Sequence, residues 1–237
     1  MSIVYRWLET PKYTTEQVRA FAAGAVYLAM ETRDGITADH CDDLDYNAAF
    51  RIANRSGLKR SWGIRGHDDA MKTMAALLDG MHAPEFDQLI SVVLPAVGAP
   101  QEHQHELLRA LRSEHGFGGS ALAGEAIAAL SLPQMLSPLP PSTYAWDVVR
   151  LAMLARRTVA ADWITPEEVL PLVVESAARA RNTFGDWREF GNSFVLGRAL
   201  WSCDGRPGAA EKSLEQTLPL IDSLLTEPSS PWIRLPW

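Results

Sequence analysis

Apolar side chains recur every three or four residues through most of this chain, which is the spacing of amphipathic α-helices. In the segment 66–79, for example, Ala70, Met74 and Leu77 fall on one helical face. We expect helices over 14–34, 37–56, 66–79, 84–93, 143–161, 165–184, 186–202 and 209–225, with two more between 100 and 131. The pattern predicts an all-α protein, a single domain of about nine or ten helices over residues 1–237.

Several predicted helix ends carry local signals. Capping boxes are expected at three helix starts, with the pairs Thr14 and Gln17, Thr165 and Glu168, and Asp186 and Glu189. Thr143 is expected to cap the helix that follows it. Gly57 is expected to stop the helix 37–56. The glycine-rich segment 116–120 is expected to be a flexible connection between two helices.

Proline divides the chain. Four prolines in 132–144 exclude a helix there. We expect an extended connector between an N-terminal helical part, 1–131, and a tryptophan-rich helical core, 145–237. The final PSSPWIRLPW holds three prolines, which argue against a helix, and two tryptophans. Because a free tail rarely exposes two tryptophans, we expect it to pack on the core.

Charged residues interrupt the apolar pattern of the tryptophan-rich core. Asp147 and Arg150 fall on the helix 143–161, and Glu189 and Arg198 on the next helix but one. A buried arginine needs a partner, so we expect these four residues to form one ion network. The network would either fix helix register or line a pocket that binds an anionic ligand or performs acid–base chemistry.

A second charged feature is acidic. Asp39, Asp42, Asp43 and Asp45 cluster before a basic segment, 51–65, that contains no acid. Acids at the start of a helix and bases at its end complement the helix dipole. The alternative interpretation is an acidic surface patch that docks a basic partner.

Composition narrows the classes of function. The net charge of -7 argues against a nucleic-acid-binding surface. The mean hydropathy is -0.09, and no apolar run approaches the length of a bilayer-spanning helix, so a membrane span is not expected. The N-terminus lacks the apolar region of a signal peptide, so we expect a cytoplasmic protein.

Candidate chemistry is sparse. Cys41 and Cys203 are far apart and have no Cys-x-x-Cys partner, so neither zinc nor a disulfide is expected. His103 and His105 are two apart on a helix and point to nearly opposite sides, which argues against a metal site. The chain has no G-x-S-x-G, H-E-x-x-H or Cys–His signature, so no catalytic residue and no cofactor is predicted.

These motifs resemble a bacterial family known as domain of unknown function 1266. The resemblance rests on SWGIRGHDDAMKTMAALLDGMHAPEFD at 61–87, Ala145-Trp146-Asp147, Arg150, Leu154-Ala155-Arg156, Trp163-Ile164-Thr165, Glu167-Glu168, Phe184 through Trp201, and Ser230 through Trp237. It implies one all-helical domain of bacterial origin. It also implies proximity to bacterial toxin and secretion genes, and it carries over no catalytic residues.

Three functions are compatible with this sequence. The favoured hypothesis is a non-enzymatic protein-interaction module, such as an immunity or adaptor protein that binds a basic toxin or effector through its acidic surface. The alternative is an enzyme or small-ligand-binding protein that uses the cluster of Asp147, Arg150, Glu189 and Arg198. A toxin effector is the weaker third hypothesis.

Overall fold

The protein is built almost wholly from helices. The computed structural model describes residues 3–31, 38–44, 51–131, 136–203 and 208–237. Its elements are β1 (Tyr5–Arg6), α1 (Thr15–Ala23), α2 (Ala25–Glu31), β2 (Ala38–His40), α3 (Arg51–Trp62), α4 (His67–Leu78), α5 (Ala83–Val93), the 3-10 turn η2 (Leu94–Ala96), α6 (Gln101–Leu130), α7 (Tyr144–Ala160), α8 (Pro166–Thr183), α9 (Trp187–Cys203), α10 (Ala209–Thr226) and α11 (Pro231–Arg234). The all-α prediction is confirmed.

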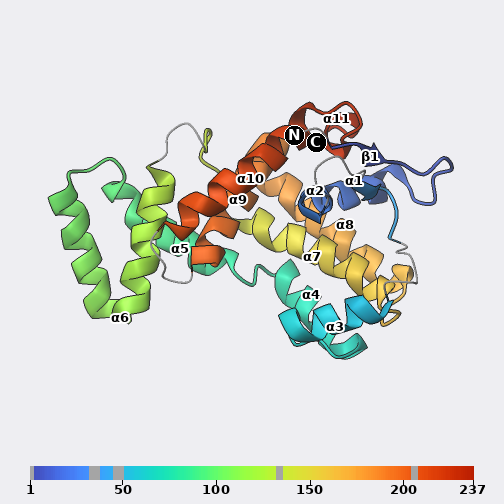
Figure 1. The fold of residues 1–237 in the computed structure, drawn as a ribbon, viewed down its shortest axis with the longest axis horizontal. Helices are drawn as coiled ribbons and strands as arrows, with labels where there is room; N and C mark the ends of the chain where they lie inside the picture. The colour runs from blue at the N-terminus through green and yellow to red at the C-terminus, as the bar shows by residue number, and fades with distance from the viewer. Residues whose placement is uncertain (1–2, 32–37, 45–50, 132–135, 204–207) are drawn as a thin grey trace.

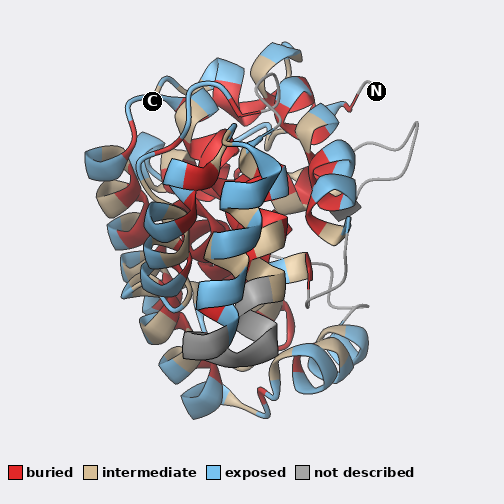
Figure 2. Ribbon diagram, turned by 90° about the vertical axis from the view of Figure 1, so that its left-hand side faces the viewer, coloured by how far each residue is buried: buried red, intermediate tan, exposed pale blue. Residues whose placement is uncertain are grey.

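Helix α7 lies at the centre of the molecule, between α8, α9 and α4 (Figure 1). It is buried on nearly every side, so that its charged residues Asp147, Arg150 and Arg156 are buried together with its apolar ones. Val148 and Val149 belong to a core shared with α9, α10 and the C-terminal tail. Leu151 and Leu154 belong to a second core shared with α1, α4 and α8. One helix therefore joins both cores, and exposed residues face outward around them (Figure 2).

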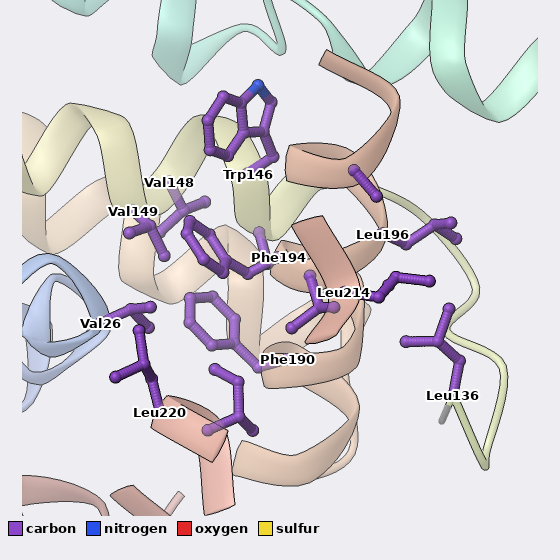
Figure 3. Packing of buried hydrophobic residues seen from close by; sticks show 14 of the residues in the cluster. Val26, Leu136, Trp146, Val148, Val149, Phe190, Phe194, Leu196, Leu214 and Leu220 are labelled. Atoms are coloured by element: carbon purple, nitrogen blue, oxygen red, sulfur yellow. The ribbon is translucent and has the colours of Figure 1, made fainter. Parts of the chain in front are cut away.

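The first core is dense because small residues let the helices approach closely. Phe190 and Phe194 of α9 pack beside Val149 of α7 (Figure 3). A Cβ placed on Gly197 of α9 would lie only 2.5 Å from Cβ of Trp146. Any larger residue at position 197 would therefore push α9 away from α7.

The capping boxes of two helices form as predicted. Thr14 accepts a hydrogen bond from Gln17 N, and the Gln17 side chain accepts one from Thr14 N. Thr165 and Glu168 do the same at the start of α8. These short-range contacts depend only on residues three apart, which explains why the sequence predicts them.

The predicted helix over 37–56 is wrong at its start and right from Arg51 onward, within α3. Residues 38–40 form β2, which pairs in parallel with β1. Helix α3 passes through Gly57 and ends at Trp62. An interior glycine costs a helix only about 1 kcal/mol, so Gly57 does not stop it. The helix ends before Gly63, whose φ of 70° is the left-handed conformation common after helices.

Helix α6 folds back on itself. A Cβ on Gly124 would lie 3.8 Å from Cδ2 of Leu108, although Leu108 lies several helical turns earlier in the chain. In a straight helix that separation would span about 24 Å. Figure 1 shows the two arms beside each other. The chain therefore reverses between Leu108 and Gly124, the interval that contains the connection predicted at 116–120.

The C-terminal tail packs on the core, as predicted. Trp232 is buried, stacks on Trp187 with ring centroids 5.0 Å apart, and donates from Nε1 to Ala22 O at 2.8 Å. Trp237 donates from Nε1 to Phe184 O. The expectation of no helix in the tail is wrong, because α11 forms one turn with Pro231 at its first position, where proline is tolerated.

Candidate functional site

The carboxylate of Asp147 is fully buried at the meeting of α7 and α5. It accepts hydrogen bonds from His82 N at 2.9 Å, Ala83 N at 3.0 Å and His82 Nδ1 at 2.7 Å. The N-terminus of α5 has no side-chain cap of its own. Asp147 supplies the missing acceptor, and its charge complements the dipole of α5. Three donors satisfy this carboxylate.

Asp87 of α5 in turn bonds to the residues at the start of α7. It accepts from Thr143 N and Thr143 Oγ1, both at 2.7 Å, and from Ser142 Oγ at 2.6 Å. The prediction that Thr143 caps α7 with its own hydroxyl is wrong, because that hydroxyl donates to Asp87 instead. A carboxylate of α7 thus accepts hydrogen bonds from the start of α5, and a carboxylate of α5 accepts them from the start of α7. Sequence reasoning missed Asp87 and His82 as partners, because each lies far from its partner along the chain.

Arg150 lies one turn after Asp147 on α7. Its Nη1 is 3.1 Å from Nδ1 and 3.0 Å from Nε2 of His82. Because these distances are nearly equal, the guanidinium lies over the face of the imidazole. Its Cζ also lies over the rings of Trp62 at 4.3 Å, Trp146 at 4.9 Å and Trp201 at 5.6 Å. Burial lowers the pKa of Arg150, and the aromatic faces offset part of that cost.

Trp201 forms the outer end of this stack. Trp201 is 51% exposed, whereas Trp146, which lies behind it, is only 1% exposed. The two ring centroids are 5.5 Å apart. The indole nitrogen of Trp146 is buried without a hydrogen-bond partner, and Figure 3 shows it on the side of the ring away from Phe194. The exposed side chain of Trp201 therefore packs on its inner side against the guanidinium of Arg150 and the buried ring of Trp146.

Glu189 and Arg198 do not join Asp147 and Arg150. Glu189 lies at the start of α9, where its Oε2 accepts from Gly185 N at 2.6 Å. Arg198 lies more than two turns further along α9, half-buried, and Asp147 is not among its partners that the structure describes. The single four-residue network predicted from sequence does not form. Asp147 and Arg150 meet through His82, and Glu189 instead accepts from the backbone of Gly185, between α8 and α9.

The predicted acidic surface is also revised. Asp42 is buried and accepts from Leu8 N with both carboxylate oxygens, at 3.0 and 3.1 Å. Asp43 is buried and pairs with Lys12 at 3.0 Å. Neither aspartate is on an exposed face, because each satisfies donors from the N-terminal segment. The side chain of Asp39 and the whole of Asp45 lie outside the described residues.

Comparison with known proteins decides the family. A family model described as "Protein of unknown function (DUF1266)" matches residues 57–237. The chain belongs to the DUF1266 family. Residues of this site on α3, α7 and α9 lie within the DUF1266 match, including Trp62, Asp147, Arg150 and Trp201.

Two relatives come from Escherichia coli strain K12. The protein titled "Uncharacterized protein YbeU" is 28% identical over 144 residues, and "Uncharacterized protein YbeR" is 26% identical over 144 residues. Each match covers 61% of this chain and 56% of the relative, so the chain spans about half the length of these DUF1266 relatives. No solved structure matches the chain. Among the described residues, no helix has the length and apolar character needed to cross a bilayer.

Proposed function

We propose that this protein acts by binding another protein, and that the surface around Trp201 makes the central contact. The observation that carries the proposal is the 51% exposure of Trp201, backed by Trp146 and by the guanidinium of Arg150. Tryptophan and arginine are over-represented among the residues that dominate binding energy at protein interfaces. A side chain that is already held in place also loses little conformational entropy on binding.

This proposal keeps the interaction module predicted from sequence and moves its contact surface. Docking through Asp42 and Asp43 would require these buried carboxylates to leave the donors that they satisfy. A contact centred on Trp201 is mainly apolar, so its affinity should depend only weakly on salt. An immunity protein and an adaptor, both in the cytoplasm, are special cases of the proposal. The identity of the partner distinguishes them.

The enzyme alternative receives less support. It requires the carboxylates and arginines predicted from sequence to act together, and Glu189 is bonded to Gly185 at the other end of α9. The imidazole of His82 is partly exposed, and it is held between the carboxylate of Asp147 and the guanidinium of Arg150. No hydroxyl or thiol group is among the contacts of His82 that the structure describes.

The experiment compares Trp201→Ala with Ile52→Ala, which removes another exposed apolar side chain, on α3. Tagged wild-type protein captures partners from the source bacterium, and mass spectrometry identifies them. Binding of the purified partner is then measured by calorimetry at 50 and 500 mM salt. We expect Trp201→Ala to weaken binding at least tenfold, Ile52→Ala to change it less than twofold, and salt to have little effect.

Two outcomes would overturn the proposed surface. One is wild-type affinity in the Trp201→Ala variant. The other is a large loss of affinity at high salt together with an unchanged Trp201→Ala variant, which would point to an electrostatic surface elsewhere. Trp201→Phe separates a lost contact from a disturbed fold, because it keeps an aromatic ring against Trp146 and should retain most of the affinity.

A further inference from the structure

An open hollow of about 420 Å³ lies between α3 and the turn that leads into α8. Helix α3 lies at one edge of the molecule (Figure 1). The hollow is lined by Ile52, Arg55, Ser56, Lys59, Arg65 and Trp163. Its three cationic residues are exposed, and no carboxylate is among the described residues that line it. The hollow therefore presents accessible positive charge beside an aromatic ring and an aliphatic side chain.

The three cations of this hollow have no acidic partner in the part of the chain that the structure describes. Two carboxylates that lie close to them along the chain make other contacts. Asp162 pairs with Arg51 at 3.3 Å, and Asp69 accepts a hydrogen bond from Arg65 N at 3.0 Å. The positive charge of the hollow is therefore available to another molecule.

The helix dipole does not account for these charges. The sequence pattern places acids at the start of this helix, but residues 38–40 form β2, and α3 has no acidic residue in its first turn. Arg51 and Arg55 lie in the first half of α3, where the dipole does not favour a positive charge. Arg65 lies beyond the end of α3, and only Lys59 of the lining cations is in its last turn. A negatively charged partner gives the other positions a reason that the dipole does not supply.

Arg55 and Trp163 are held in place before anything binds. Arg55 Nε donates to Ala161 O at 2.7 Å, and its Cζ lies 6.0 Å from the ring centroid of Trp163. Trp163 N donates to Thr158 O at 3.1 Å, and the half-buried side chain of Trp163 packs against the second core. The terminal nitrogens of Arg55 have no hydrogen-bond partner among the described residues. Groups that are ordered in advance lose little conformational entropy on binding.

We propose that this hollow docks an acidic segment of another protein, with carboxylates on Arg55, Lys59 and Arg65 and an apolar side chain against Trp163. Charge complementarity favours this occupant, because carboxylates form strong hydrogen bonds with all three cations. A nucleic acid fits less well. The chain has a net charge of -7, so a long run of phosphates would meet the acidic remainder of the molecule. The contact is separate from the one at Trp201, and neither proposal rests on the other.

The test uses a fluorescent seven-residue peptide with one tryptophan among acidic residues, and a matched peptide in which glutamine and asparagine replace the acids. Fluorescence polarisation measures binding to the whole chain, and chemical shifts of ¹⁵N-labelled protein locate the site. We expect saturable binding of the acidic peptide, with shifts at 55–65 and at the indole of Trp163. The matched peptide should bind at least tenfold more weakly. An increase from 50 to 500 mM salt should weaken binding of the acidic peptide at least tenfold.

Charge reversal at single positions locates the contact. Arg65→Glu lies outside any helix, so it changes the hollow without changing α3. It should weaken binding of the acidic peptide at least fivefold, as should Lys59→Glu. Lys212→Glu makes the same change of charge at an exposed position of α10 and should alter the affinity less than twofold. Trp201→Ala should leave the affinity unchanged, which separates this site from the other proposed surface.

Several results would overturn the proposal. They are non-saturable binding of the acidic peptide, equal affinity for the two peptides, and an equal loss of affinity in Arg65→Glu and Lys212→Glu. Single-stranded oligodeoxythymidine and vesicles of anionic phospholipid are measured in parallel. If either binds more tightly than the acidic peptide and loses affinity in Arg65→Glu, the occupant is a nucleic acid or a membrane surface instead.

Discussion

His67 lies between two carboxylates at the start of α4. Its Nδ1 is 2.9 Å from Asp68 and its Nε2 is 3.0 Å from Glu168 of α8. These contacts, with Asp68 first, raise the pKa of His67 above 6.5. Protonated His67 therefore stabilises the fold. This contribution is fully present below pH 6.5 and is lost as pH rises through the raised pKa of the folded state.

The pKa of His67 can be measured by NMR titration of its ring protons. Glu168→Gln removes one of the two charges and should lower this pKa toward its ordinary value. Glu167→Gln changes the neighbouring exposed residue, which does not contact His67 in the structure, and should leave the titration unchanged. Equal titration midpoints in wild type and Glu168→Gln would show that the contact does not persist in solution.

Asp147 shows why a residue can be singled out correctly and paired wrongly. An aspartate in an apolar helix predicts a buried charge with a partner. Its partners are the backbone and imidazole of His82, together with the backbone of Ala83, at the start of a helix much earlier in the chain. Helical periodicity relates positions three or four apart, and it carries no information about such a distance.

At the scale of elements, glycine sets how closely helices approach. Gly197 of α9 faces Trp146 of α7, and a Cβ there would meet the Trp146 Cβ at 2.5 Å. Gly57 of α3 has nothing within 4 Å of the equivalent position. The two glycines have the same helix propensity and opposite surroundings, so their substitution separates packing from propensity.

Gly197→Ala should destabilise the protein by about 1–3 kcal/mol, because overpacking outweighs the gain in helix propensity. Gly57→Ala should stabilise it by about 0.5–1 kcal/mol, because only the propensity changes. Urea denaturation of both variants measures the difference. Equal changes in both variants would contradict the close contact between α7 and α9.

At the scale of the whole molecule, the C-terminal tail joins segments that are far apart in sequence. Trp232 stacks on Trp187 of α9 and bonds to Ala22 of α1. Ser229, just before α11, accepts from Tyr5 N at 3.1 Å. The tail therefore closes the first core against the N-terminal helices, and its loss should weaken the entire fold.

Trp232→Ala should lower the free energy of unfolding by about 3–5 kcal/mol, as expected when a buried tryptophan is removed. Ile233→Ala, at the next position but 48% exposed, should change it by less than about 0.5 kcal/mol. Chemical denaturation compares the two variants. A small effect in Trp232→Ala would mean that the tail is not part of the cooperative unit.

Much of the fold is predictable because its signals are local. The capping boxes at Thr14 and Thr165 need residues three apart, and the amphipathic pattern needs one or two turns. The predicted helix over 37–56 is wrong over 38–40, where β2 pairs with β1, a strand that precedes α1 and α2 in the chain. The prediction that Gly57 ends the helix is wrong for a related reason. The sequence alone does not distinguish a glycine inside a helix from one at its C-terminus.

The sequence by itself determined the helical class, the capped starts of α1 and α8 and the packing of the tryptophan-rich tail, because local periodicity, capping and apolar content specify them. Only the tertiary structure decided that Asp147 bonds to His82, that Asp42 and Asp43 are buried, and that Trp201 is exposed. The physical reason is that a charged side chain takes its partner from whichever helix packs against it. That choice depends on the approach of distant segments, which no short sequence pattern records.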